Sequence, residues 1–208
     1  MQFHKGKNYQ NTALHKNDLD KNPFISLNQW VNEAKDSGIE DYNAFHLSSS
    51  DLKGNVSGRI VLLKLIESDK IIFFTDYSSR KGEQINENPK VAATFYWGPM
   101  ERQIRIEGTI EKSTDMINNQ YFSQRPRESQ AAAIASNQSK EIENRDLLES
   151  KYQEIINDNN ELKRPNNWGG YEISPKYFEF WQGRPNRLND RIAYKKLENS
   201  WNKFRLAP

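Results

Sequence analysis

The sequence predicts a mainly β protein of the α+β class, in which an antiparallel barrel is flanked by helices. Five strand-like stretches follow one another on short connections in the first 113 residues. Short connections favour antiparallel strands, because a parallel pair needs a crossover of about a dozen or more residues. Three helical stretches then interrupt the pattern, and strand-like sequence returns at Trp168. A β-barrel interrupted by helices fits this order of elements.

Each element follows from its local pattern. Residues 1–22 are polar and lack hydrophobic periodicity, so we expect a mobile N-terminal arm ahead of a single domain over residues 23–208. From Pro23, apolar residues recur at helical spacing and Gly38 offers a stop, which predicts a helix with one buried face. The strands expected after it span 44–50, 57–67, 70–77, 90–97, 101–113, 168–182 and 191–197, and the helices span 114–124, 127–136 and 144–160.

The composition excludes several kinds of site. The 208 residues include no cysteine, which rules out disulfides, thiolate metal sites and cysteine nucleophiles. The three histidines all lie within the first 46 residues, so we expect neither a histidine-based triad nor a metal site. An enzyme of this composition needs an organic cofactor for difficult chemistry.

Charge and hydropathy limit the partners and the location. Thirty basic residues are interleaved with 28 acidic ones, which argues against a nucleic-acid partner, because such proteins present a strongly basic face. No stretch approaches the roughly 20 apolar residues of a membrane span, and the N-terminus lacks the pattern of a signal peptide. We therefore expect a cytoplasmic protein without a membrane partner, in which local arginine clusters have local roles.

Two stretches combine cations with groups that suit a phosphate. In SSRKGEQI, residues 78–85, Arg80 and Lys81 stand beside two serines where a strand leads into a short helix. A solvated helix start is the alternative interpretation. In RIVLLK, strand alternation puts Arg59 on one face and Lys64 on the other, each beside apolar neighbours. These charges need partners, which are either anionic ligands or strand-end ion pairs.

A third stretch, YFSQRPRESQ, offers a phenol, a guanidinium and a hydroxyl. Tyr121, Arg125 and Ser129 share one helix face if the helix is unbroken. Pro126 fits a helix start better than a helix interior, which leaves that geometry open. If the three groups converge, they are suited to bind a phosphate.

Together, the motifs resemble one family. The order and spacing of the pyridoxine/pyridoxamine 5′-phosphate oxidase family are matched from about residue 9 onward by RIVLLK, FFT, SSRK, ERQIRIEG, YFSQRPRESQ, NQS, WGGYEISP, FEFWQG, RLNDR and RLAP. The resemblance implies an antiparallel Greek-key split β-barrel and a homodimer with FMN at the subunit interface. It also implies oxidation of pyridoxine 5′-phosphate or pyridoxamine 5′-phosphate to pyridoxal 5′-phosphate, with O₂ reduced to H₂O₂, in vitamin B6 biosynthesis and salvage.

The resemblance further implies two sets of ligand-binding residues. FMN is expected to be held by Arg59, Ile60, Val61, Leu62, Lys64, Phe74, Thr75, Ser79, Arg80, Lys81, Gln103, Gln138 and Ser139, with Trp181 and Arg191 reaching it across the dimer interface. The substrate phosphate is expected at Lys64, Tyr121, Arg125 and Ser129. Arg187 and Asn189, the catalytic candidates, are expected near the pyridine ring, and Lys7 and Tyr9 of the arm are expected to fold over the substrate.

The chain departs from the family pattern near its C-terminus. Asn189 stands where the family usually has histidine, and an asparagine hydrogen-bonds but does not titrate near neutral pH. Arg187 and Arg191 are four residues apart, so on a strand they face the same side, whereas Arg184 has no assigned role and is expected in solvent. Two alternatives stay open: a split-barrel flavin oxidase acting on another heteroaromatic substrate, and a non-catalytic FMN or pyridoxal phosphate carrier.

Overall fold

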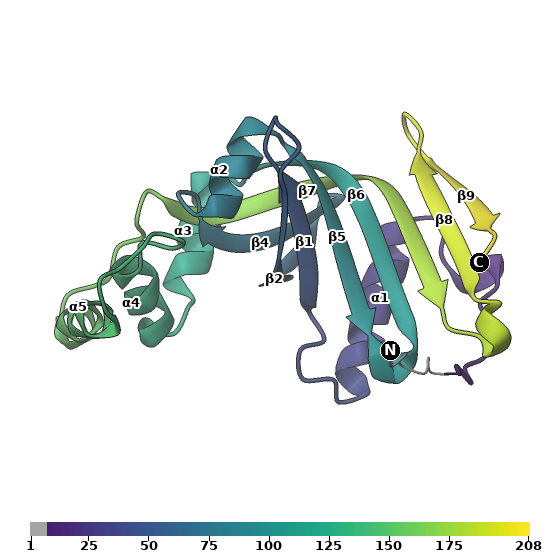
Figure 1. The fold of residues 1–208 in the computed structure, drawn as a ribbon, viewed down its shortest axis with the longest axis horizontal. Helices are drawn as coiled ribbons and strands as arrows, with labels where there is room; N and C mark the ends of the chain where they lie inside the picture. The colour runs from purple at the N-terminus through teal and green to yellow at the C-terminus, as the bar shows by residue number, and fades with distance from the viewer. Residues whose placement is uncertain (1–7) are drawn as a thin grey trace, which may run out of the picture.

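A single curled antiparallel sheet organises residues 8–208, the part of the chain that the computed structural model describes (Figure 1). Its strands are β1 (Ala44–Ser50), β2 (Val56–Leu62), β3 (Leu65–Glu67), β4 (Lys70–Asp76), β5 (Lys90–Trp97), β6 (Arg102–Lys112), β7 (Trp168–Gln182), β8 (Asp190–Lys196) and β9 (Trp201–Leu206). They are ordered β2-β1-β5-β6-β7-β4-β3, and β8 joins the second half of β7 and pairs with β9. The predicted mainly β, antiparallel fold is confirmed.

Helices flank the sheet. They are α1 (Pro23–Asp36), α2 (Arg80–Glu87), α3 (Asp115–Ser123), α4 (Arg127–Ala135) and α5 (Arg145–Asn157), with short 3₁₀ turns η1 (Lys16–Asp18), η2 (Gly98–Met100) and η3 (Pro185–Arg187). The predicted helix after Pro23 and the three predicted central helices are confirmed. None of the helices that residues 8–208 form is long and apolar enough to cross a membrane.

One predicted strand, 57–67, is wrong as a single element. The structure ends β2 at Leu62 and begins β3 at Leu65. Between them the backbone N–H of Leu63 donates to Asn43, beside β1, and that of Lys64 donates to Ile72 on β4. The chain thus changes pairing partners at this point, so one sequence run contributes to two regions of the sheet. Lys64 lies at the crossing.

The core lies between the sheet and α1. Helix α1 begins where the Asn22 side chain accepts a hydrogen bond from the backbone N–H of Phe24. Its buried face inserts Trp30 edge-on against Phe180 of β7, with ring centroids 5.1 Å apart, and Phe24 meets Phe178 in the same way. This packing fixes the second half of β7 against a rigid support.

Residues 8–22 run along the β8–β9 edge. Leu14 and Leu19 are buried in the core cluster, and the Lys203 ammonium on β9 donates to the backbone carbonyls of Lys16 and Leu19 at 2.7 Å each. Residues 1–7, which include the predicted substrate residue Lys7, lie outside the described part of the chain. The mobility of the arm and its boundary at residue 22 stay predictions.

Candidate functional site

A cavity of about 520 Å³ opens where the β2–β3 crossing, β4 and the α3–α4 junction meet. It brings together eleven of the predicted ligand-binding residues: Ile60, Val61, Leu62, Lys64, Phe74, Thr75, Lys81, Tyr121, Arg125, Ser129 and Gln138. Trp168, which the sequence reasoning did not single out, completes the wall. Residues predicted to bind FMN and residues predicted to bind the substrate phosphate therefore line one cavity.

Lys81 is the most buried cation of this cavity. Ser79 caps the N-terminus of α2, and the Lys81 ammonium turns back to donate to Thr75 Oγ1 at 2.8 Å, to Ser79 Oγ at 3.1 Å and to Gln138 Oε1. Burial, followed by the charge of Arg59, lowers the pKa of Lys81 to about 8. Among residues 8–208 the ammonium donates only to neutral oxygens, and the attraction of the Asp76 carboxylate is weaker than the repulsion by Arg59, so its charge is poorly compensated.

Arg59 lies near Lys81, and its positive charge is likewise held by neutral hydrogen-bond acceptors. Its guanidinium donates to the Leu47 carbonyl at 3.1 Å and to the hydroxyls of Ser49 and Ser57. Burial and the charge of Arg80 lower the pKa of Arg59. Within residues 8–208 neither Arg59 nor Lys81 forms an ion pair with a carboxylate, so the end of the cavity near α2 is suited to an anion.

Tyr121, Arg125 and Ser129 converge across a helix break. The geometry that Pro126 left open is resolved as two helices: α3 ends at Ser123, and Pro126 precedes the first residue of α4. Tyr121, Arg125 and Ser129 still line the same cavity, because the two helices meet at this break. Burial lowers the pKa of Lys64 and Arg125 and raises that of Tyr121, which keeps the phenol a neutral hydrogen-bond donor.

Another group of predicted residues lies at the far end of β7. Gln103 on β6, Trp181 on β7 and Arg191 on β8 form one row across three strands, and the Tyr9 ring meets Trp181 edge-on at 5.4 Å. Arg191 differs from the cations of the cavity, because the buried Glu179 carboxylate accepts two hydrogen bonds from it, at 2.8 and 3.0 Å. Its charge is therefore already compensated.

The loop that carries Arg187 is not part of a strand. Strand β8 begins only at Asp190, so the expectation that Arg187 and Arg191 share a strand face is wrong. Asn186 and Arg187 adopt positive φ angles of 58° and 61°, in the left-handed region that non-glycine residues avoid. The Asn189 side-chain oxygen accepts a hydrogen bond from the Arg184 backbone N–H at 2.9 Å, and this contact closes the loop.

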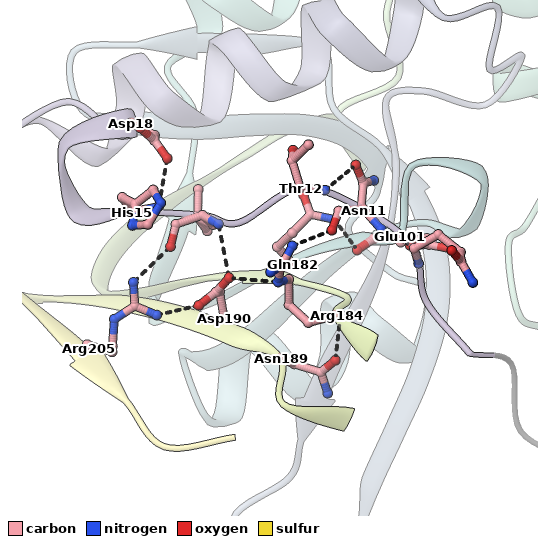
Figure 2. Close-up of polar contacts among 12 residues, drawn as sticks. Asn11, Thr12, His15, Asp18, Glu101, Gln182, Arg184, Asn189, Asp190 and Arg205 are labelled. Atoms are coloured by element: carbon pink, nitrogen blue, oxygen red, sulfur yellow. Dashed lines mark hydrogen bonds and ion pairs between the residues drawn. The ribbon is translucent and has the colours of Figure 1, made fainter. Parts of the chain in front are cut away.

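Arg184 is not solvated as expected, which corrects that prediction. Figure 2 shows it between Asn189, Asp190 and the segment around Asn11. Its guanidinium donates to the backbone carbonyl of Asn11, and its Nε lies 3.5 Å from an Asp190 oxygen. The same carboxylate accepts the backbone N–H of Leu14 at 3.0 Å. Arg184 thus ties residues 8–22 to the loop.

The contact of Asn189 gives a first prediction. Asn189→Ala is expected to speed amide hydrogen exchange at Arg184 by about 2- to 10-fold, because the closing hydrogen bond is lost. Asn189→Asp keeps an acceptor oxygen and serves as the matched control. Hydrogen exchange followed by NMR checks this, and an unchanged Arg184 rate in the alanine variant would show that the side chain does not brace the loop.

Comparison with known proteins decides the family. Residues 31–157 match the family model described as pyridoxamine 5′-phosphate oxidase, and residues 168–208 match that of the pyridoxine 5′-phosphate oxidase C-terminal dimerisation region. The chain belongs to the pyridoxamine 5′-phosphate oxidase family. The second match, to a dimerisation region, indicates a homodimer.

Relatives in this family match along nearly the whole chain. A protein of Idiomarina loihiensis is 45% identical over 199 residues, covering 94% of each chain, and one of Leptospira interrogans is 42% identical over 205 residues, covering 97% of this chain and 96% of its own. Both are named pyridoxine/pyridoxamine 5′-phosphate oxidase.

Solved structures confirm the split-barrel fold. PhzG of Burkholderia lata, in complex with tetrahydrophenazine-1-carboxylic acid, superimposes with a TM-score of 0.90 at 27% identity, over 94% of this chain and 98% of its own. A pyridoxamine 5′-phosphate oxidase-related FMN-binding protein of Nostoc punctiforme superimposes with a TM-score of 0.74 at 14% identity, which shows a similar fold and nothing further.

The two groups of family residues lie apart within one chain. Gly169, beside the cavity, and Trp181 are twelve residues apart on β7. At about 3.3 Å per residue, the path between them is roughly 40 Å. Figure 1 shows α2, α3 and α4 near one end of the long strand and β8 and β9 at the other. A single copy therefore does not bring Trp181 and Arg191 to its own cavity.

Proposed function

We propose that the chain is an FMN-dependent oxidase that converts pyridoxine 5′-phosphate or pyridoxamine 5′-phosphate to pyridoxal 5′-phosphate, with O₂ reduced to H₂O₂. The observation that supports this most strongly is the presence of two poorly compensated cation sets at one cavity: Lys81, with Arg59 beside it, and Lys64 with Arg125. A flavin nucleotide and its substrate each bring one phosphate, so two such sets are needed.

The first set fits the phosphate of FMN. Lys81 offers a buried positive charge, Arg59 a half-buried one, Ser79 a hydroxyl, and α2 the backbone N–H groups of its first turn. Arg80 adds an exposed positive charge at the same helix start, and Thr75, Gln138, Ser139 and the strand Ile60–Leu62 would border the rest of the cofactor. When bound, FMN supplies the hydride acceptor for the substrate carbon and the route of electrons to O₂.

The second set fits the phosphate of the substrate. Lys64 and Arg125 supply charge, Tyr121 and Ser129 supply hydroxyl donors, and Arg125 Nη1 is buried without a hydrogen-bond partner among residues 8–208. A buried donor that lacks a partner costs free energy, about 1–3 kcal/mol, and a ligand oxygen would relieve that cost. The arrangement therefore favours a ligand with a compact anionic group at this position.

The separation of the two residue groups supports a shared site in the dimer. We propose that Trp181 and Arg191 of the partner subunit, with the loop that carries Arg187, complete the cavity, while Gln103 and Tyr9 support Trp181 from the same chain. Arg187 would then lie near the pyridine ring, and Asn189 would hold its loop. In this arrangement the residues of the chain bind and orient the ligands, and they exclude water from the reacting atoms.

A different heteroaromatic substrate is the main alternative. PhzG has a carboxylic acid bound, which carries no phosphate. The set Lys64, Tyr121, Arg125 and Ser129 is more than a single carboxylate requires and suits the three oxygens of a phosphate. A yellow protein without turnover would instead support the carrier hypothesis.

The test is H₂O₂ release from protein loaded with FMN. Pyridoxine 5′-phosphate and pyridoxamine 5′-phosphate are each compared with unphosphorylated pyridoxine, and we expect release with the phosphorylated compounds at much lower concentrations. No release with either phosphorylated compound, from protein that has bound FMN, would refute the proposed function.

The lowered pKa of Lys81 predicts a pH dependence of FMN binding. Free Lys81 loses its proton above about pH 8, whereas a bound phosphate dianion favours the charged ammonium, so binding takes up a proton above that pH. FMN affinity is therefore expected to be nearly complete at pH 7 and below, and to fall up to about tenfold between pH 7 and 9. Flavin fluorescence quenching measures it. In Lys81→Met this pH dependence should disappear, and its persistence would assign it to another group.

A further inference from the structure

The Arg125 guanidinium is held by an aromatic ring. Its central carbon lies 4.6 Å from the centroid of the Trp168 ring and 6.0 Å from that of Phe122. Within residues 8–208 no carboxylate forms an ion pair with Arg125, and its Nη1 has no hydrogen-bond partner. A guanidinium over an indole face gains about 0.5–2 kcal/mol, with the larger values where water is excluded.

Trp168 is itself firmly fixed. It is 6% exposed, opens β7 opposite Asp76, and its carbonyl accepts a hydrogen bond from Arg164 at 2.7 Å. Arg164 in turn pairs with Asp115 at the start of α3. The indole therefore holds its position relative to both the sheet and the helix that precedes Arg125.

The same ring belongs to a stack that includes the Tyr121 phenol. Phe74 lies against Tyr121 with centroids 3.8 Å apart and planes inclined by 13°. Trp168 is nearly parallel to both rings, at 5.6 Å from Phe74 and 6.3 Å from Tyr121. The two groups expected to meet the ligand phosphate thus take their positions from one set of aromatic faces.

We propose that Trp168 is a positioning residue, whose indole face holds the Arg125 guanidinium where other proteins would use a carboxylate. A carboxylate would compensate the positive charge and compete with the ligand for the same N–H groups. An aromatic face orients the guanidinium while leaving its charge and its outward N–H groups to the phosphate. Trp168 therefore sets how strongly the site prefers phosphorylated ligands. This inference rests on the proposed role of the cavity in binding the substrate phosphate.

The test compares phosphorylated and unphosphorylated ligands on protein loaded with FMN. Calorimetry measures the dissociation constants of pyridoxal 5′-phosphate, inorganic phosphate and pyridoxal. For Trp168→Leu we expect about 5- to 30-fold weaker binding of the two phosphate ligands, with pyridoxal changed less than about twofold. Trp168→Phe, which keeps an aromatic face, is expected to lose about 2- to 5-fold with the phosphate ligands alone.

Two controls separate positioning from general damage. Trp201→Leu removes a tryptophan that packs on Phe24 and Phe178, far from the cavity, and should leave all three dissociation constants unchanged. In an Arg125→Gln background, Trp168→Leu should cost less than about twofold further, because the two residues act together.

Equal weakening of pyridoxal and its phosphate, or full additivity with Arg125→Gln, would overturn the inference. If Trp168→Leu does not fold, the selective loss in Trp168→Phe decides the question, and an unselective loss there overturns the inference too. Failure of the proposed function is seen separately, as absence of H₂O₂ release from the unaltered protein.

Discussion

Arg125→Ala is expected to lower kcat/KM for pyridoxine 5′-phosphate by about 100-fold or more, mostly through KM. The guanidinium is half-buried in the cavity and lacks a carboxylate partner, so in the complex its counter-charge comes from the ligand. Its removal leaves the phosphate with a single cation, Lys64, on that side. Initial rates of H₂O₂ release over a substrate series measure the effect.

Arg145→Ala is the matched control for this variant. Arg145 lies at the start of α5 and lines a neighbouring cavity, but its side chain is 85% exposed and pairs with Glu149. Exposed pairs of this kind contribute little, so kcat/KM should change less than about twofold. FMN content should stay at the level of the unaltered protein in both variants. Loss of FMN from Arg125→Ala would place this arginine in the cofactor site instead.

Lys81→Met is expected to weaken FMN binding by about 30-fold or more and to give nearly colourless purified protein. The ammonium is buried, has neutral oxygens as its only hydrogen-bond partners among residues 8–208, and stands beside Arg59. A methionine fills similar space but leaves the cofactor phosphate with only the half-buried Arg59 of the two cations. Absorbance of the flavin after dialysis and a titration with added FMN measure the change.

Lys151→Met controls for the loss of one positive charge. Lys151 is exposed on α5 and should leave the FMN dissociation constant unchanged. The Lys81→Met substitution should not lower the stability of the folded state. A lysine whose pKa is lowered on folding opposes folding below that pKa, so its replacement is expected to leave thermal stability equal or higher at pH 7. Unaltered FMN affinity in this variant would contradict the assignment of the first cation set.

Local patterns predicted most of the fold because each element has its own signal. Runs of strand-forming residues between turn signals mark the strands, and apolar residues at helical spacing from Pro23 to the stop at Gly38 mark the first helix. The break between Leu62 and Leu65 has no such signal: the stretch contains no glycine or proline, and Lys64 stands between apolar residues on both sides. Its cause lies in distant partners, Asn43 on one side and Ile72 on the other.

Local motifs drew attention to the cations of the cavity, and the family resemblance implied its other residues. Contacts between distant parts of the chain had no such signal. Arg184 donates a hydrogen bond to the carbonyl of Asn11, a residue 173 positions away, and the sequence near either residue gives no sign of that contact. The left-handed conformation of Arg187 likewise depends on the closed loop and not on its own preference. Trp168 was not predicted as a site residue because a tryptophan at the start of a strand is usually a core residue. Its contact with Arg125 forms only in the folded chain.

The long strand β7 also governs when the protein becomes functional during synthesis. Its first half pairs with β4, joining Ile173 to Ile71 about a hundred residues earlier, and it supplies Trp168 to the cavity. Until this segment leaves the ribosome, one edge of β4 has no partner there, and such an open strand edge favours association with other chains. A partial chain that lacks β7 therefore has an incomplete cavity in which to bind the cofactor.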